Sequence, residues 1–294
     1  MIIVRLIGGL GNQMFQYALG RNLARINKTT LKLDKTELEL KPLSGTPRSY
    51  NLQVFNIVEN FASGEEIKKI RGSSSGRLFT VVTKMLKLRE RSSVVSEKKD
   101  YVFDSRVLRS GDNVYIQGYW NNEKYFRDIR KMILKDFTIK EPIDKTNETT
   151  LNQINNTLSV SLHVRRGDYI KSKKTNQHHG TCGLGYYQNA INIIASKVKN
   201  PSFFAFSDEI KWVKNNLKTE YSIKYVDHND DAHNYEDLRL MSACKHNIIA
   251  NSSFSWWGAW LNPNQDKIVI APKKWLNDPS IDTSDVTPKS WLRI

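Results

Sequence analysis

The second half of the chain alternates short apolar stretches with amphipathic ones, and this rhythm restricts the fold more than any other feature. In chain order, the strand-like stretches are 158–163, 202–206, 222–226, 247–250 and 267–270, and the helix-like stretches between them are 186–199, 209–217, 233–243 and 252–261. Strands that alternate with helices form a parallel sheet, and such a sheet gathers ligands at the carboxyl ends of its strands. We therefore predict an α/β domain.

The first half opens with the same kind of unit. An apolar stretch at 2–7 precedes Gly8-Gly-Leu-Gly11, a helical pattern at 12–26 and a second strand at 29–34. Further on, 64–70 and 122–136 have helical patterns, and 114–117 is extended. Residues 140–150 are polar and contain Pro142, which indicates a linker. The sequence thus predicts two domains, 1–145 and 146–294, whose last residues can pack back on the first domain.

Charge leaves several partners open. The chain of 294 residues carries a net charge of +15, and residues 65–99 hold ten Lys or Arg against four acids. Nucleic acid, an anionic membrane surface and a phosphorylated substrate could each explain this excess. Because no aromatic interleaving, RNP-like pattern or zinc-finger pattern accompanies it, we expect no nucleic-acid partner. A solvated basic face is the first explanation, and weak association with an anionic membrane surface is the second.

The two cysteines, Cys182 and Cys244, support neither a disulfide framework nor a metal knuckle, and they suit a reducing compartment. No apolar run reaches the length of about 20 residues that spans a bilayer, and residues 1–7 are too short for a signal peptide. We expect a cytoplasmic protein, associated at most with the inner face of the membrane.

An arginine pair follows the strand at 158–163. Arg165 and Arg166 present planar forks of donors that suit the oxygens of a diphosphate better than a single carboxylate. Gly167 lets the backbone turn close to a ligand, and Asp168 can hold one guanidinium in place. The alternative is that both arginines simply pair with surface acids.

Two other strand ends join this edge in the predicted sheet. Ser252 and Ser253 begin a helix whose first N–H groups favour an anion, although an ordinary serine cap is the alternative. Asp208 can accept paired hydrogen bonds from guanine or merely cap a helix. Trp256, Trp257 and Trp260 have helical spacing and are expected in the core. No ligand spacing for a metal is visible, so we expect no metal and no cofactor.

The glycine turn at the start of the chain has two interpretations. Gly9 and Gly11 after a strand, with Asp34 about twenty residues on, resemble a dinucleotide fingerprint, but Met14 occupies the place of the third glycine. The other interpretation is that this turn aims the amides of Asn12 and Gln13 at sugar hydroxyls in a cleft.

Three motifs together resemble those of the bacterial α-1,2-fucosyltransferases of glycosyltransferase family 11. They are Gly8-Gly-Leu-Gly-Asn-Gln-Met-Phe-Gln16, His163-Val-Arg-Arg-Gly-Asp168 and Asn251-Ser-Ser-Phe-Ser-Trp-Trp257. The resemblance implies a GT-B fold, in which two Rossmann-like domains face each other across a cleft. It also implies metal-independent, inverting transfer of fucose from GDP-β-L-fucose, bound by the C-terminal domain, to a terminal galactose bound by the N-terminal one. The acceptor expected by resemblance is an O-antigen or capsule repeat.

The resemblance also implies roles for individual residues. Those implied for catalysis are Arg166, Asn12 and Asp168. Those implied for donor binding are Gly11, Gln13, His163, Arg165, Asp208, Ser252, Ser253, Phe254 and Ser255.

The sequence is also compatible with three other functions. They are α-1,6-fucosyl transfer, because the arginine-pair motif occurs in both groups, a non-catalytic protein that binds a nucleotide sugar or carbohydrate, and a nucleic-acid-binding protein. The base that accepts the acceptor's proton could be Asp34, His179 or water.

Overall fold

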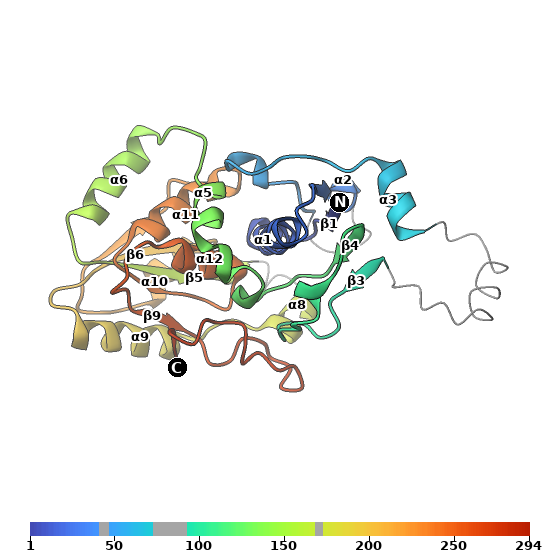
Figure 1. The fold of residues 1–294 in the computed structure, drawn as a ribbon. Helices are drawn as coiled ribbons and strands as arrows, with labels where there is room; N and C mark the ends of the chain where they lie inside the picture. Colours follow the sequence, from blue (N-terminus) through green and yellow to red (C-terminus); the bar gives the residue numbers. More distant parts are fainter. Residues whose placement is uncertain (41–46, 73–92, 168–172) are drawn as a thin grey trace. The chain divides into compact units, whose positions relative to one another are not determined.

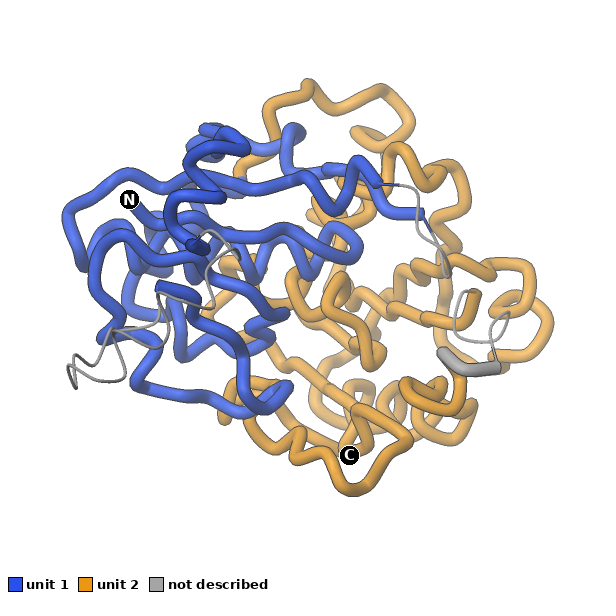
Figure 2. The backbone as a smooth tube through the Cα atoms, turned by 90° about the vertical axis from the view of Figure 1, so that its right-hand side faces the viewer, with its two compact units in different colours: residues 1–137 blue, residues 138–294 orange. Residues whose placement is uncertain are grey.

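The computed structural model describes residues 1–40, 47–72, 93–167 and 173–294 (Figure 1). The chain divides into two compact units, Met1–Phe137 and Thr138–Ile294 (Figure 2). The predicted linker is wrong in its second half, because Lys145–Asn155 form helix α6 of the second unit. Asp144 caps this helix by accepting hydrogen bonds from the N–H groups of Thr146 and Asn147.

The first unit contains a four-stranded sheet in which every paired strand is parallel. Its order is β2-β1-β4-β3, with β1 at Ile2–Arg5, β2 at Leu31–Asp34, β3 at Val94–Ser96 and β4 at Val114–Gln117. Ile2, Ile3 and Val4 are fully buried, as a strand covered on both faces requires. The α/β prediction for the first half is confirmed.

The helices of this unit include α1, which packs on the sheet. The described helices are α1 (Leu10–Ile26), α2 (Thr36–Glu39), α3 (Gly64–Arg71), α5 (Arg130–Asp136) and the 3₁₀ turns η1 (Leu52–Val54), η2 (Val107–Arg109), η3 (Glu123–Tyr125) and η4 (Arg127–Ile129). The predicted helix over 122–136 is therefore wrong in its first half. Phe126 has φ −147° there, which interrupts a helix between η3 and η4.

The second unit contains a six-stranded parallel sheet in the order β10-β9-β8-β5-β6-β7. Its strands are β5 (Ser159–Val164), β6 (Ser202–Ser207), β7 (Ile223–Val226), β8 (His246–Ile248), β9 (Val269–Ala271) and β10 (Leu292–Arg293). The five strands predicted for this half are confirmed, and β10 is added. The last residues therefore extend this unit's own sheet through β9.

Helices connect these strands. Besides α6 they are α8 (Lys173–His179), α9 (Leu184–Lys197), α10 (Ile210–Asn216), η5 (Asp231–His233), α11 (Asn234–Ala243) and α12 (Ser253–Leu261). Helix α8 was not predicted, because its polar residues show no apolar periodicity. The tryptophans of α12 are buried, and Trp256 stacks on Trp260 with ring centroids 6.1 Å apart. Their predicted place in the core is confirmed.

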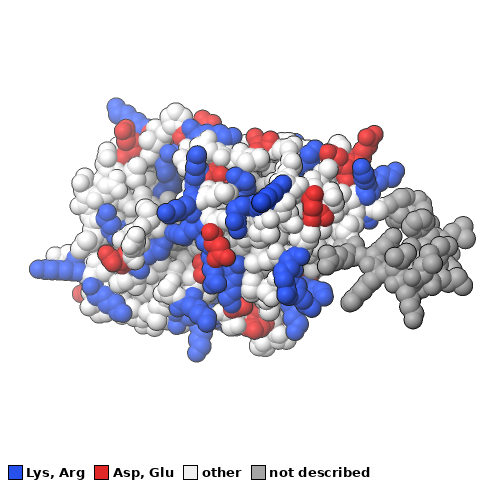
Figure 3. All heavy atoms as spheres, in the orientation of Figure 1, with Lys and Arg blue, Asp and Glu red and all other residues white. Residues whose placement is uncertain are grey.

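The structure tests the predictions about the basic face and the membrane only in part. Most of the basic stretch at 65–99 lies outside the described residues. On the face shown in Figure 3, basic side chains are scattered among acidic ones. Within the described residues, no helix is both long and apolar enough to cross a bilayer. Cys182 and Cys244 are buried free thiols.

We predict that Gly20→Ala destabilises the first unit. A Cβ at Gly20 of α1 would lie 2.3 Å from Val4 Cγ2 and 2.8 Å from Leu31 Cδ1, so the helix would have to move off the sheet. The free energy of unfolding should fall by about 1–3 kcal/mol in chemical denaturation. Gly64→Ala is the matched control, because nothing lies within 4 Å of its Cβ position and alanine favours a helix. A rise in stability for both variants would contradict the packing.

Candidate functional site

The strand order of the second unit creates a switch point between β5 and β8. From β5 the chain moves outward to β6 and β7, and it then returns to the other side of β5 as β8, β9 and β10. In open α/β sheets, ligands bind outside the carboxyl ends of the strands at such a point. The segments that follow β5, β6 and β8 are therefore neighbours at one edge. The sequence prediction that these three strand ends share an edge is confirmed.

Asp208 holds the turn that carries the arginine pair. Its Oδ1 accepts a hydrogen bond from the backbone N–H of Arg166 (3.0 Å), and its Oδ2 lies 3.2 Å from Arg165 Nε. A Cβ at Gly167 would approach Asp208 Oδ2 to 2.7 Å, so only glycine fits there without displacement. This holding role was predicted for Asp168, which lies outside the described residues. The predicted contact of Asp208 with guanine stays a prediction.

Arg166 rests on an aromatic ring. Its Cζ lies 3.6 Å from the ring centroid of Trp212, a residue of α10. A guanidinium over an indole face is attracted by the ring's quadrupole, and its rotamers are restricted. Trp212 was not predicted as a site residue, because one tryptophan in a short helix carries no motif.

His163 is a buried, neutral imidazole at the end of β5. Its side chain is 4% exposed, and burial followed by the nearby charge of Arg165 lowers its pKa to about 3. Its Nδ1 has no hydrogen-bond partner among the residues that the structure describes. The ring of Phe254, from α12, lies 5.8 Å away between centroids. A ring nitrogen in this position can hydrogen-bond a ligand.

The start of α12 lies at the same edge and presents the N–H groups of a helix's first turn. Ser252 is the N-cap residue, but its hydroxyl makes no capping hydrogen bond, so the ordinary serine cap is not what the structure shows. The amides of the first turn, at Ser253 and Phe254, therefore remain suited to an anion. Ser255 is buried, and its hydroxyl donates to the carbonyl of Ser252 at 3.4 Å. Ser255 thus supports the turn.

Asn251 fixes the segment that precedes α12. Its buried amide nitrogen donates to the carbonyls of His179, Gly180 and Trp275 at 3.0–3.3 Å. The amide therefore ties together three stretches that are distant in sequence. This role was missed, because only the assembled sheet brings these carbonyls to one residue.

The buried side chain of Gln13 holds the glycine turn of the first unit in place. Gln13 is fully buried, and its amide donates to the carbonyls of Gly8 (2.9 Å) and Ser49 (2.8 Å) while accepting from Asn51 N–H (3.0 Å). Both amide hydrogens and the oxygen are thus used by the backbone, which gives Gln13 a structural role. Gly11 is buried inside α1, whereas Asn12 is partly exposed. Gly8 has φ +76°, which a side chain would disfavour.

Asp34 also has partners within the first unit. Its Oδ1 accepts from Thr36 N–H (3.0 Å) and from the Thr36 hydroxyl (2.6 Å), and its Oδ2 accepts from Tyr115 Oη (2.7 Å). The carboxylate is 3% exposed. These contacts favour a structural role over that of a base. His179 lies on α8, with its ring 4.7 Å from that of His178.

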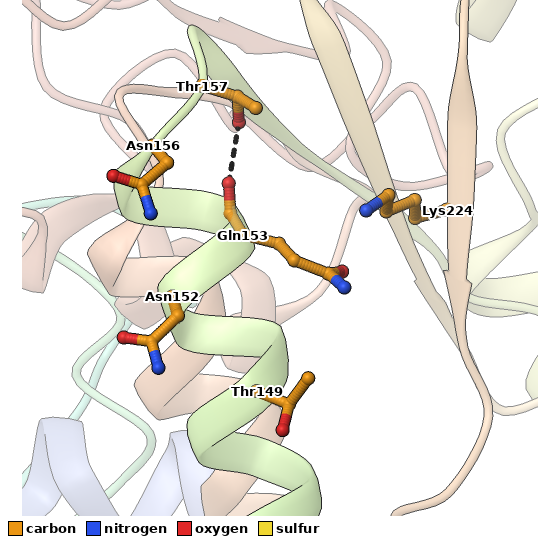
Figure 4. Close-up of a pocket in the computed structure, with 6 residues that line it drawn as sticks. All are labelled: Thr149, Asn152, Gln153, Asn156, Thr157 and Lys224. Carbon is orange, nitrogen blue, oxygen red and sulfur yellow. Dashed lines mark hydrogen bonds between the residues drawn. The ribbon is translucent and has the colours of Figure 1, made fainter.

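Among the described residues, no group of three His, Cys, Asp or Glu could hold a metal ion. An open pocket of about 400 Å³ lies between α6 and β7 (Figure 4), lined by Thr149, Asn152, Gln153, Asn156, Thr157 and Lys224. Asn156 and Thr157 precede β5, so this pocket lies toward the amino edge of the sheet, opposite the arginine pair.

Comparison with known proteins gives matches over the whole chain. Residues 97–294 match glycosyl transferase family 11. An α-1,2-colitosyltransferase from Escherichia coli is 33% identical, covering 100% of this chain and 99% of its own. The O-antigen biosynthesis glycosyltransferase WbnK from Escherichia coli is 34% identical, covering 98% of this chain and 99% of its own.

More distant similarities extend beyond bacteria. The galactoside 2-α-L-fucosyltransferase SEC1 of Bos taurus is 25% identical over 51% of this chain and 43% of its own. Among solved structures, an Arabidopsis thaliana FUT1 mutant in complex with GDP matches with a TM-score of 0.53 and 10% identity, covering 99% of this chain and 75% of that one. With the two parallel sheets, this likeness identifies the fold as GT-B.

We predict that His163 makes the fold sensitive to acid. Because its pKa falls from 6.5 in the unfolded chain to about 3 in the folded one, the unfolded state binds more protons between these values. Stability is thus lost as pH falls below about 6.5. In His163→Gln, the loss of unfolding free energy between pH 7 and pH 4 should be smaller by about 2–3 kcal/mol.

Denaturant titrations at both pH values measure this difference. His178→Gln is the matched control, because His178 is exposed and stays in solvent on unfolding. Equal acid sensitivity of wild type and His163→Gln would show that His163 is not held neutral in the fold.

Proposed function

The chain belongs to glycosyl transferase family 11 and is a glycosyltransferase of the galactoside α-1,2-fucosyltransferase family, and from this premise we propose that it transfers L-fucose from GDP-β-L-fucose to the 2-hydroxyl of a terminal galactose. The product would be an α-1,2 linkage in an O-antigen or capsule repeat. The bacterial relative named for O-antigen biosynthesis supports this class of acceptor. The mammalian relative named as a galactoside 2-α-L-fucosyltransferase supports the sugar and the position.

One observation carries the proposal. The Asp208 carboxylate fixes the arginine pair at the carboxyl end of β5, and this end lies at the switch point beside the segment that leads into α12. Two guanidiniums and the first-turn amides of a helix form a site for a diphosphate. The donor would lie with its diphosphate here, and Nδ1 of His163, which no described residue pairs, would be available to the nucleotide.

The mechanism follows from where charge develops. The acceptor's 2-hydroxyl oxygen attacks C1 of fucose, and the bond from C1 to the phosphate oxygen breaks with its electron pair leaving on GDP. A single displacement of this kind inverts the configuration, from the β-linked donor to the α-linked product. Arg165, Arg166 and the helix amides stabilise the departing negative charge without a metal ion. The acceptor's proton leaves to water or to a side chain such as His179.

A second donor is supported by one specific observation. The bacterial relative at 33% identity is named as a colitosyltransferase, and colitose is L-fucose without its 3-hydroxyl. A site that hydrogen-bonds this hydroxyl would reject the deoxy sugar, whereas an apolar site would accept it. GDP-colitose is therefore the alternative donor.

We predict that Arg166→Ala slows transfer by about a hundredfold or more, because the loss of a fixed charge on the leaving group costs about 3 kcal/mol. The measurement is GDP release in EDTA, with GDP-fucose or GDP-colitose as donor. Lactose and galactosyl-β-1,3-N-acetylgalactosamine serve as acceptors. Acceptor-dependent release that survives EDTA is expected for the wild type, and the faster donor identifies the sugar.

Lys199→Ala is the matched control. Lys199 is exposed and precedes β6, so it lies toward the amino edge of the sheet, and its loss should leave the rate unchanged. A wild-type rate in Arg166→Ala would remove the arginine pair from the mechanism. Binding of GDP-fucose without any turnover would favour the non-catalytic binding protein instead.

A further inference from the structure

The carboxyl edge of the first unit's sheet carries a loop with no assigned role, Gly118–Asn122. It follows β4, which pairs in parallel with β1, so it lies beside the turn that leads into α1. Gln16 ties the two together. Its amide nitrogen donates to the carbonyls of Ile7 (3.3 Å) and Gly118 (3.1 Å), and its oxygen accepts from Ile7 N–H (3.0 Å). The loop and the turn that carries Asn12 therefore form one edge.

Glu97 holds the loop in an unusual conformation. Its carboxylate accepts hydrogen bonds from the N–H groups of Tyr119 (2.6 Å) and Trp120 (3.1 Å). Trp120 has φ +60°, in a region that bulky residues rarely adopt. Gly118 has φ +152°, and a Cβ there would lie 2.5 Å from Glu97 Cβ. The backbone is thus held by the surrounding structure.

Three consecutive side chains of this loop present buried polar atoms that lack a partner. They are Trp120 Nε1, Asn121 Oδ1 and Asn122 Nδ2, and none has a hydrogen-bond partner within the described parts of the chain. Their residues are 1%, 8% and 1% exposed. Since nearly all buried polar atoms in proteins are hydrogen-bonded, a run of three at a strand end indicates a place for a ligand.

The three groups suit a neutral ligand rich in hydroxyls. An indole N–H and an amide N–H donate, and an amide oxygen accepts, while a sugar hydroxyl both donates and accepts. Tyr119 of the same loop is 41% exposed and offers an aromatic surface for the apolar face of a sugar ring.

We propose that the Tyr119–Asn122 loop binds the acceptor sugar. This inference rests on the proposed function, in which the arginine pair of the second unit takes the nucleotide diphosphate. The hydroxyl-rich acceptor then needs its own neutral site, and Trp120, Asn121 and Asn122 supply the hydrogen bonds for it.

The first test separates the Michaelis constants of the two substrates. In Asn121→Ala and Trp120→Phe, the KM for lactose should rise at least about fivefold, because each variant removes one hydrogen-bonding group. The KM for GDP-fucose should change by less than about twofold. Asn56→Ala, an exposed asparagine of the same unit, is the matched control and should behave as wild type. An unchanged KM for lactose, or an equal rise for GDP-fucose, overturns the proposal.

The second test does not need turnover. Saturation-transfer difference NMR measures the binding of lactose and of galactosyl-β-1,3-N-acetylgalactosamine, without donor, to wild type and Asn121→Ala. Thermal unfolding first verifies that the variant is folded. A signal present in wild type and lost in the variant supports the sugar site, even where the wild type transfers no fucose and the proposed function fails. Equal signals, or no signal with wild type, overturn the site.

Discussion

The carboxylate of Asp208 is the contact on which the candidate donor site depends. It accepts from the backbone N–H of Arg166 and pairs with the side chain of Arg165, so one group fixes both the path of the turn and one of its charges. Gly167 leaves the room that this carboxylate needs, and Trp212 supports the remaining guanidinium. A charge that is already in place costs no reorganisation when negative charge develops on a leaving group.

Other loops of the two sheets are also held in place by a polar side chain that hydrogen-bonds the backbone. Gln13 and Gln16 hold the turn before α1, Glu97 holds the loop after β4, and Asn251 holds the segment before α12. In each case a buried amide, or the partly buried carboxylate of Glu97, satisfies backbone groups that no helix or strand pairs. Some polar residues of the sequence motifs therefore hold the backbone at the carboxyl edge of a sheet. The others remain for binding a ligand.

The strands of both sheets are largely predictable from the sequence. In a parallel sheet, strands alternate with helices along the chain, and each element shows its own local apolar pattern. The five predicted strands from β5 to β9, the helix α1 and the buried tryptophans of α12 were all visible as patterns. Helix α8 and the two-residue strand β10 were not, since neither has an apolar periodicity.

For the site, the strand ends were predictable, but the hydrogen-bond partners of the site residues were not. Asp208 holds the arginine turn and Gln13 holds the loop at Ser49, and neither contact was predicted. Such contacts join residues that are distant in sequence, and no local pattern encodes them.

The measurement that tests the central claim most directly is calorimetric titration of the wild type, in EDTA, with GDP, GMP and guanosine. If the arginine turn binds a diphosphate, GDP should bind at least about tenfold more tightly than guanosine, with GMP between them. Equal affinity for GDP and guanosine would contradict the account, because the nucleotide would then be held without the arginine turn.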